Sequence, residues 1–60
     1  MKEHYVIVSV YGGYYDASTK KFRGFLFATK YDDELFTKRV IDNFASLIEP
    51  CYIIKTYDRT

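Results

Sequence analysis

A single amphipathic helical pattern limits the folds open to this chain. The segment DDELFTKRVIDNFASLIE, residues 32–49, carries apolar side chains at the spacing of one helical face. They are Phe36, Val40, Phe44, Leu47 and Ile48. We expect a helix over residues 32–48 with Asp32 as its N-cap. Pro50 prevents the helix from continuing further. The sequence predicts no second helix, so this one must cover whatever sheet the rest of the chain forms.

Three other segments are rich in β-branched and aromatic residues, which is typical of strands. The clearest is HYVIVSVY (residues 4–11), and CYIIKTY (residues 51–57) follows the helix. We predict strands near residues 4–15, 20–30 and 51–57. Gly12 and Gly13 interrupt the first of them, which indicates a bulge, a kink or the end of regular pairing.

The stretch YYDASTKKF, residues 14–22, predicts a hairpin turn. Asp16 can accept hydrogen bonds from backbone N–H groups two residues further on, as Asp often does in turns. The string YDASTKKF resembles the second hairpin of the immunoglobulin-binding domain of streptococcal protein G, where an Asp-initiated loop is followed by Thr-Lys and a returning Phe. This local resemblance implies turn geometry only, with Asp16 opposite Lys21 and Tyr15 opposite Phe22.

If that register continues, Tyr11 pairs with Leu26 and Val10 with Phe27. Side chains alternate between the two faces of a strand. One face, which we expect against the helix, then carries Val6, Val8, Val10, Phe25 and Phe27. The predicted core adds helix and third-strand residues and consists of Val6, Val8, Val10, Phe25, Phe27, Phe36, Val40, Phe44, Leu47, Ile48 and Ile54.

The element order β-β-α-β predicts a single small α+β domain over residues 1–60. A right-handed crossover places the third strand beside the first, giving a three-stranded antiparallel sheet of order 2-1-3 with one helix packed on one face. A chain of 60 residues buries only about 60% of the surface that its unfolded form exposes, and its one cysteine cannot form an internal disulfide. Such a chain needs a dense aromatic core or association with another chain.

The sheet face opposite the helix is expected to be apolar and uncovered. Its predicted members are Tyr5, Ile7, Tyr11, Tyr15, Phe22 and Leu26. Since exposed apolar patches mark interaction sites, we expect this face, or an edge strand beside it, to contact another protein. The expected partners are a second copy of the chain, in a homodimer, and a cellular protein that the chain binds or inhibits. By size and composition alone, this is similar to small inhibitors encoded by phages and mobile elements.

Two other interpretations of that face stay open. The aromatic rings could stack on bases of single-stranded nucleic acid beside the basic side chains Lys20, Lys21, Arg23 and Lys30. A net charge of only +1 argues against a strongly electrostatic binder. In the remaining interpretation the tyrosine hydroxyls face water and nothing binds.

The sequence shows no pattern for catalysis or for a cofactor. His4 and Cys51 lack the third group that a nucleophilic site needs and cannot complete a zinc site. Asp32, Asp33 and Glu34 suit the positive end of a helix. We therefore expect a non-enzymatic chain without a metal or cofactor. The longest apolar run is far shorter than the ~20 residues of a membrane span, and the lone cysteine favours a reducing, cytoplasmic setting.

Overall fold

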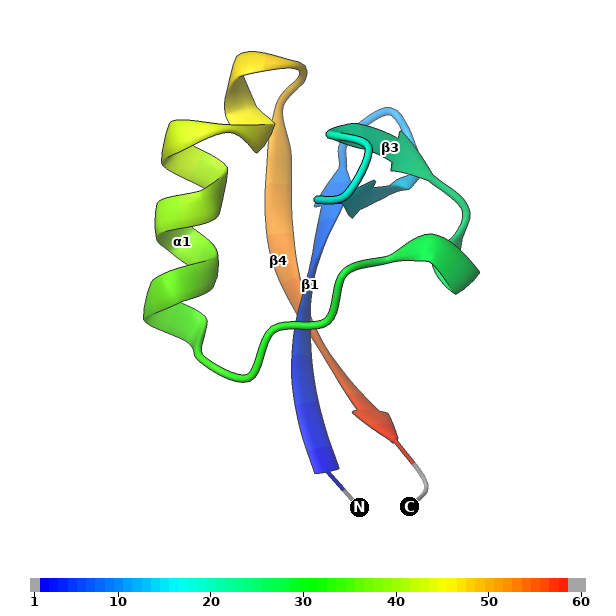
Figure 1. Cartoon of the computed structure of the whole chain (residues 1–60), viewed down its shortest axis with the longest axis vertical. Helices are drawn as coiled ribbons and strands as arrows, with labels where there is room; N and C mark the ends of the chain where they lie inside the picture. The colour runs from blue at the N-terminus through cyan, green and yellow to red at the C-terminus, as the bar shows by residue number, and fades with distance from the viewer. Residues whose placement is uncertain (1, 59–60) are drawn as a thin grey trace.

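The computed structural model describes residues 2–58 and shows one helix beside an antiparallel sheet (Figure 1). The strands are β1 (Lys2–Ser9), β2 (Tyr14–Asp16), β3 (Lys21–Arg23) and β4 (Cys51–Asp58). The helix α1 spans Glu34–Asn43, and the chain forms two short 3-10 helices, η1 (Phe25–Phe27) and η2 (Ala45–Leu47). The start of β1 and the end of β4 lie side by side (Figure 1).

The sheet has the order β3-β2-β1-β4, and each neighbouring pair is antiparallel. β1 and β4 form its longest ladder, from Lys2 opposite Asp58 to Ser9 opposite Cys51. The α+β class and the antiparallel pairing of the first and last strands are confirmed. The prediction of three strands in the order 2-1-3 is wrong, because the segment expected as the first strand forms two strands.

Gly12 and Gly13 cause this division. Their φ angles are +96° and +98°, in the left-handed region that favours glycine. The Ser9 N–H donates to the Gly13 carbonyl at 3.0 Å, the Gly12 N–H donates to the Ser9 carbonyl at 3.1 Å, and Val8 lies opposite Tyr14. The two glycines therefore close a hairpin between β1 and β2 instead of bending one long strand.

The second hairpin, between β2 and β3, has the predicted register. Tyr15 lies opposite Phe22, and Asp16 lies opposite Lys21. The ladder ends where Tyr14 faces Arg23, and η1 begins soon afterwards. The further predicted pairs, Tyr11 with Leu26 and Val10 with Phe27, are wrong, because the reversal at the glycines carries residues 10 and 11 away from this hairpin.

α1 packs on the sheet face that carries Ile7, and not on the face that carries Val6 and Val8. The buried core consists of Ile7, Tyr15, Val40 and Ala45, with Ala17, Phe22, Tyr31, Ile41 and Cys51 packed around it. The prediction that Val6, Val8, Val10, Phe25 and Phe27 face the helix is wrong. The sequence correctly groups Ile7, Tyr15 and Phe22 on one face of the sheet, and the error is that the helix was expected on the other face.

Much of the predicted core is exposed. Val6, Val8 and Val40 are buried, and Ile54 is partly buried. The other members are about half exposed or more: Val10, Phe25, Phe27, Phe36, Phe44, Leu47 and Ile48. Seven of the eleven residues predicted for the core therefore contribute apolar surface to the outside of the molecule.

The helix is also shorter than predicted. It begins after Asp33, whose carboxylate accepts the N–H of Leu35 at 3.0 Å, so Asp33 and not Asp32 is the N-cap. It ends at Asn43, so the apolar residues of η2 no longer continue its stripe. Asp32 instead contacts the start of β1, where its carboxylate lies 3.1 Å from the His4 ring nitrogen.

Candidate protein-binding edge

β4 is the last strand of the sheet and has one free edge. β1 pairs with its other edge along all eight residues. Within residues 2–58, no strand pairs with the outer edge of β4. Figure 1 shows β4 as a long strand running beside β1, with α1 along one side of the pair. Such an edge offers unpaired backbone donors and acceptors to another chain.

The hydrogen bonds of β1 show which residues of β4 point outward. Tyr5 exchanges N–H···O bonds of 2.7 and 2.9 Å with Tyr31, on the side of β1 away from β4. The Val10 N–H donates to the Pro50 carbonyl at 3.0 Å, on the side facing β4. Residues of an antiparallel strand alternate between its two edges, so the even-numbered residues of β1 bond to β4.

The register then assigns each backbone group of β4 to an edge. Ile54 lies opposite Val6, so its N–H and C=O point toward β1. The residues between such pairs direct their N–H and C=O groups to the free edge, and they are Cys51, Ile53, Lys55 and Tyr57. The free edge therefore presents four donors and four acceptors in a regular row.

β4 has few of the features that protect natural edge strands from pairing. Proteins usually shorten such strands or place charges, prolines or bulges in them. Lys55 is the one charged residue in CYIIKTY, and Pro50 precedes the strand. The Lys55 ammonium lies 3.7 Å from the carboxylate of Glu3 on β1, and Glu3 is the main cause of the raised pKa of Lys55. The charge is thus drawn back over the sheet, away from the free edge.

A concavity of about 490 Å³ lies beside this edge, between α1 and β4. Its lining consists of Tyr5, Glu34, Lys38, Ile41, Ile53 and Lys55. Glu34 and Lys38 form an ion pair of 3.5 Å on its helix wall. Side chains of a strand added to β4 would enter this space on the helix side of the sheet.

The six residues predicted for protein interaction do not share one exposed face. Ile7 and Tyr15 belong to the core, and Phe22 packs against it, so their expected exposure is wrong. Tyr5 is partly buried at the concavity beside β4. Tyr11 and Leu26 are 76% and 93% exposed, but they lie on separate segments, the first turn and η1. The role of these residues in binding stays a prediction.

Two of the basic residues proposed for nucleic acid, Lys20 and Arg23, make local contacts with other side chains. The Lys20 ammonium lies 5.4 Å from the centre of the Phe44 ring. Arg23 lies 3.9 Å from the Phe27 ring and 3.4 Å from the Asp16 carboxylate. Lys21 and Lys30 are exposed. Nucleic-acid binding therefore stays a prediction that no feature of this geometry favours.

The residues considered for catalysis and metal binding are not brought together. His4 lies opposite Thr56, near one end of the β1–β4 ladder, and Cys51 lies opposite Ser9 at the other end. Burial raises the pKa of the Cys51 thiol, which disfavours the nucleophilic thiolate. Among the residues that the structure describes, no group of three or more His, Cys, Asp or Glu side chains could hold a metal ion.

Comparison with known proteins gives no relative from which a function could be transferred. No protein family, curated protein or solved structure matches the chain. Between residues 2 and 58, no helix is both long and apolar enough to cross a membrane. Among the surfaces described above, the free edge of β4 is the candidate site with the best-defined geometry.

Proposed function

We propose that the chain is a protein-interaction module that forms a homodimer by antiparallel pairing of β4 with β4 of a second copy. The observation that carries this proposal is the free edge of β4, an eight-residue strand with few charged residues and an uninterrupted row of outward N–H and C=O groups. Pairing two such edges would satisfy these groups and join two sheets into one. It would also cover apolar surface on Ile53, Tyr52 and Tyr57, which are partly or half exposed.

A two-fold axis at Ile54 uses this edge best. It pairs residues 51–57 of one copy with residues 57–51 of the other and forms about eight backbone hydrogen bonds. An axis at Lys55 would set two ammonium groups opposite each other, which is destabilising. An axis at Ile53 would leave Thr56 and Tyr57 beyond the paired region. With Ile54 on the axis, Lys55 lies opposite Ile53 of the second copy. Its side chain stays in the concavity of its own copy, which Glu34 also lines.

Two substitutions at Lys55 test this dimer. Lys55→Pro removes an N–H that points to the free edge, so the β1–β4 ladder within the monomer keeps its hydrogen bonds. Lys55→Val is the matched control, because it removes the same charge and salt bridge but keeps the N–H. A single strand pair is a small interface, so we expect a dissociation constant on the order of 10 µM for the unaltered chain. Sedimentation equilibrium should show Lys55→Val as a dimer and Lys55→Pro as a monomer with an unchanged circular dichroism spectrum.

The contrary result is clear. A chain that sediments as a monomer at several hundred micromolar, or a folded Lys55→Pro variant that dimerises as well as Lys55→Val, would refute edge pairing.

The register of the dimer has its own test in a Cys51→Ser background. Ile54→Cys should form an intermolecular disulfide readily, since residues of a non-hydrogen-bonded pair have Cα atoms about 4.5 Å apart. Tyr52→Cys should not, because it lies two residues from the axis.

A cellular protein with an exposed strand would compete for the same edge. Strand addition is a common way in which proteins capture extended segments of their partners. We therefore propose that binding of a cellular partner, including any inhibition of it, occurs at β4 and is exclusive with the homodimer. A partner that binds Lys55→Val but not Lys55→Pro would support this, and one that binds both variants equally would contradict it.

A further inference from the structure

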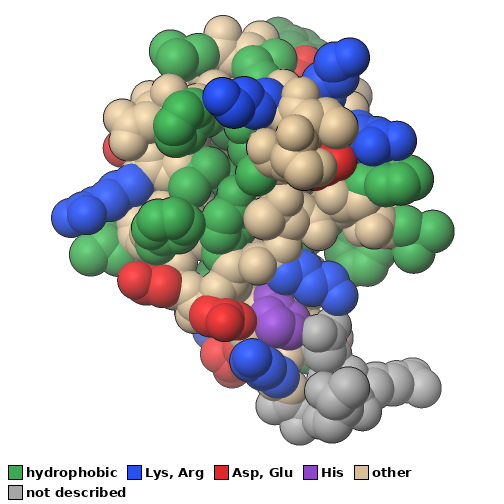
Figure 2. Space-filling view, viewed as in Figure 1, with side chains coloured by type: hydrophobic (Ala, Val, Ile, Leu, Met, Phe, Trp, Pro, Cys, Tyr) green, Lys and Arg blue, Asp and Glu red, His purple; other side chains and the backbone are tan. Residues whose placement is uncertain are grey.

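A second concavity lies on the other side of α1 from β4. It encloses about 300 Å³ and is lined by Tyr15, Ala17, Lys20, Thr29, Tyr31, Phe36, Val40 and Phe44. We call it the hairpin groove, because it separates α1 from the β2–β3 hairpin and the segment that follows. Figure 2 shows hydrophobic side chains gathered on this face of the molecule, with Lys and Arg side chains around them. Its volume is at the lower end of the range for small-molecule sites.

The helix wall of the hairpin groove is the stripe that the sequence assigned to the core. Phe36, Val40 and Phe44 lie four residues apart and so on one helical face. Val40 is buried at the base, whereas the two phenylalanine rings are about half exposed and stand along the groove. The stripe therefore only partly reaches the sheet, and the rings line an open space.

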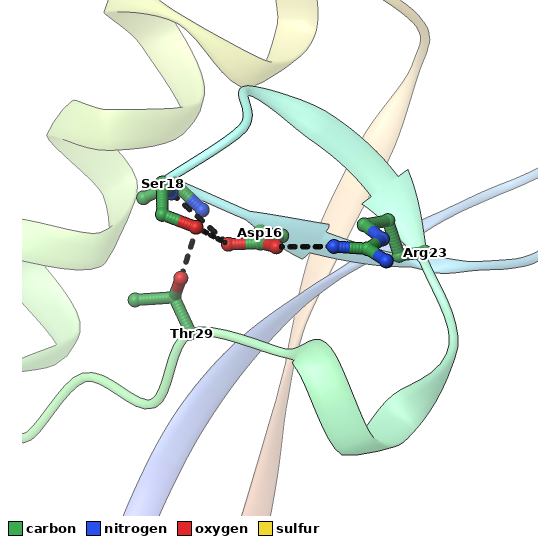
Figure 3. A network of polar contacts seen from close by, with 5 residues as sticks. Asp16, Ser18, Arg23 and Thr29 are labelled. Atoms are coloured by element: carbon green, nitrogen blue, oxygen red, sulfur yellow. Dashed lines mark hydrogen bonds and ion pairs between the residues drawn. The ribbon is translucent and has the colours of Figure 1, made fainter.

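The opposite wall is held in place by hydrogen bonds. Tyr31 is fixed to β1 by its two bonds with Tyr5, and its ring lies 5.8 Å from the Phe36 ring. The Ala17 N–H donates to the Thr29 hydroxyl at 2.8 Å, which joins the hairpin tip to this segment (Figure 3). Both walls are thus fixed without a ligand, and a preformed site costs less to occupy.

The charge of the hairpin groove has one sign. Lys20 is the one charged residue in its lining, and its ammonium lies over the Phe44 ring. The neighbouring Asp16 carboxylate is engaged by Ser18 and Arg23 instead (Figure 3). Lys20 has a φ of +56°, a strained value for a residue with a side chain. Burial raises the pKa of the Tyr15 and Tyr31 hydroxyls, so both stay neutral near pH 7 and add no negative charge.

We propose that the hairpin groove binds a small molecule that has an apolar body and one carboxylate, such as an arylalkanoic acid. The apolar body lies between Phe36 and Phe44 over Val40, and the carboxylate pairs with the Lys20 ammonium. A cation at the rim of an apolar space selects an anion over a neutral ligand of the same shape. This site is separate from the β4 edge, since the two concavities have no lining residue in common. Either proposal can fail while the other stands.

The test compares 4-phenylbutyrate with 4-phenylbutan-1-ol, which has the same body without the charge. Titration followed by amide NMR shifts should give saturable changes at Val40, Phe44 and Ala17, with the acid bound at least about fivefold more tightly than the alcohol. Lys20→Gln should lower the affinity for the acid to that for the alcohol and leave the alcohol unaffected. Lys21→Gln removes a charge from the same hairpin but outside the groove lining, and it should change neither affinity.

Three results would overturn the proposal. The first is the absence of saturable shifts at the groove residues with the acid. The second is equal affinity for acid and alcohol, which would mean that Lys20 selects no anion. The third is an equal loss of acid affinity in the Lys20 and Lys21 variants, which would show only a general effect of net charge. Amide spectra of both variants without ligand establish that they are folded, and sedimentation of the same samples reports separately on the dimer.

Discussion

The assignment of the helix to the Ile7 face of β1 makes a prediction that reverses the one from sequence. Ile7 is 0% exposed in the core, whereas Val10, expected in the core, is 54% exposed just before the glycine turn. Ile7→Val removes one methylene from a packed site, which costs about 0.5–1.5 kcal/mol of unfolding free energy. Val10→Ala removes more atoms but from a site open to water, so its cost should stay within about 0.5 kcal/mol. The smaller deletion should therefore be the more damaging one.

Thermal unfolding followed by circular dichroism measures this difference directly. For a domain of this size, a loss of 1 kcal/mol lowers the Tm by roughly 8 °C. We expect Ile7→Val to lower the Tm by about 4–12 °C and Val10→Ala by less than about 4 °C. Both variants are to be compared at a concentration where sedimentation shows only monomer, because dimerisation raises the apparent Tm. A larger loss for Val10→Ala would refute our assignment of Ile7 to the core and of Val10 to the surface.

Two further predictions concern polar groups. Hydrogen bonds from Ser18, aided by Arg23, lower the pKa of Asp16 below its usual value. The contribution of this carboxylate to stability is therefore complete above about pH 4 and disappears as the pH falls through the lowered pKa. The urea midpoint should fall as the pH is lowered below about 4, and it should fall less in Asp16→Asn. The Thr56 hydroxyl is buried and has no hydrogen-bond partner among the described residues. Thr56→Val should therefore raise the urea midpoint, because it removes a desolvation cost of about 1–3 kcal/mol. A lower midpoint in this variant would show that the hydroxyl has a hydrogen-bond partner in solution.

The features that the sequence predicts correctly are local ones. The turn around Asp16, the pairing of Tyr15 with Phe22 and the existence of the helix all follow from residues within a few positions of one another. The errors come from contacts between distant segments. A Gly-Gly pair fits both a bulge and a reversal, and only the pairing of β1 with β4 and β2 decides between them. The grouping of Ile7, Tyr15 and Phe22 on one face survives this reversal, whereas the face that the helix covers and most of the predicted core differ from the prediction.

The candidate site was predictable in part for the same reason. A sheet of order 2-1-3 already places the segment 51–57 at an edge, and an edge strand was one of the two surfaces expected to bind a partner. The direction of each N–H group in β4 could not be predicted, because it depends on the register with β1. The hairpin groove was missed because the spacing of Phe36, Val40 and Phe44 shows that they share a helix face, and does not show how closely that face approaches the sheet.

Both surfaces follow from the dimensions of one short helix on a wider sheet. A helix with its side chains is about 10 Å across, whereas four strands at about 4.8 Å spacing span roughly 14 Å between their outer axes. Ten residues of α1 are also only about 15 Å long, against about 27 Å for the eight-residue β1–β4 ladder. The helix can therefore cover the middle of the sheet around Ile7 and must leave uncovered surface on both flanks. One flank ends in the β4 edge with its unpaired backbone groups, which suits a strand, and the other is the apolar hairpin groove with Lys20 at its rim, which suits a small anion.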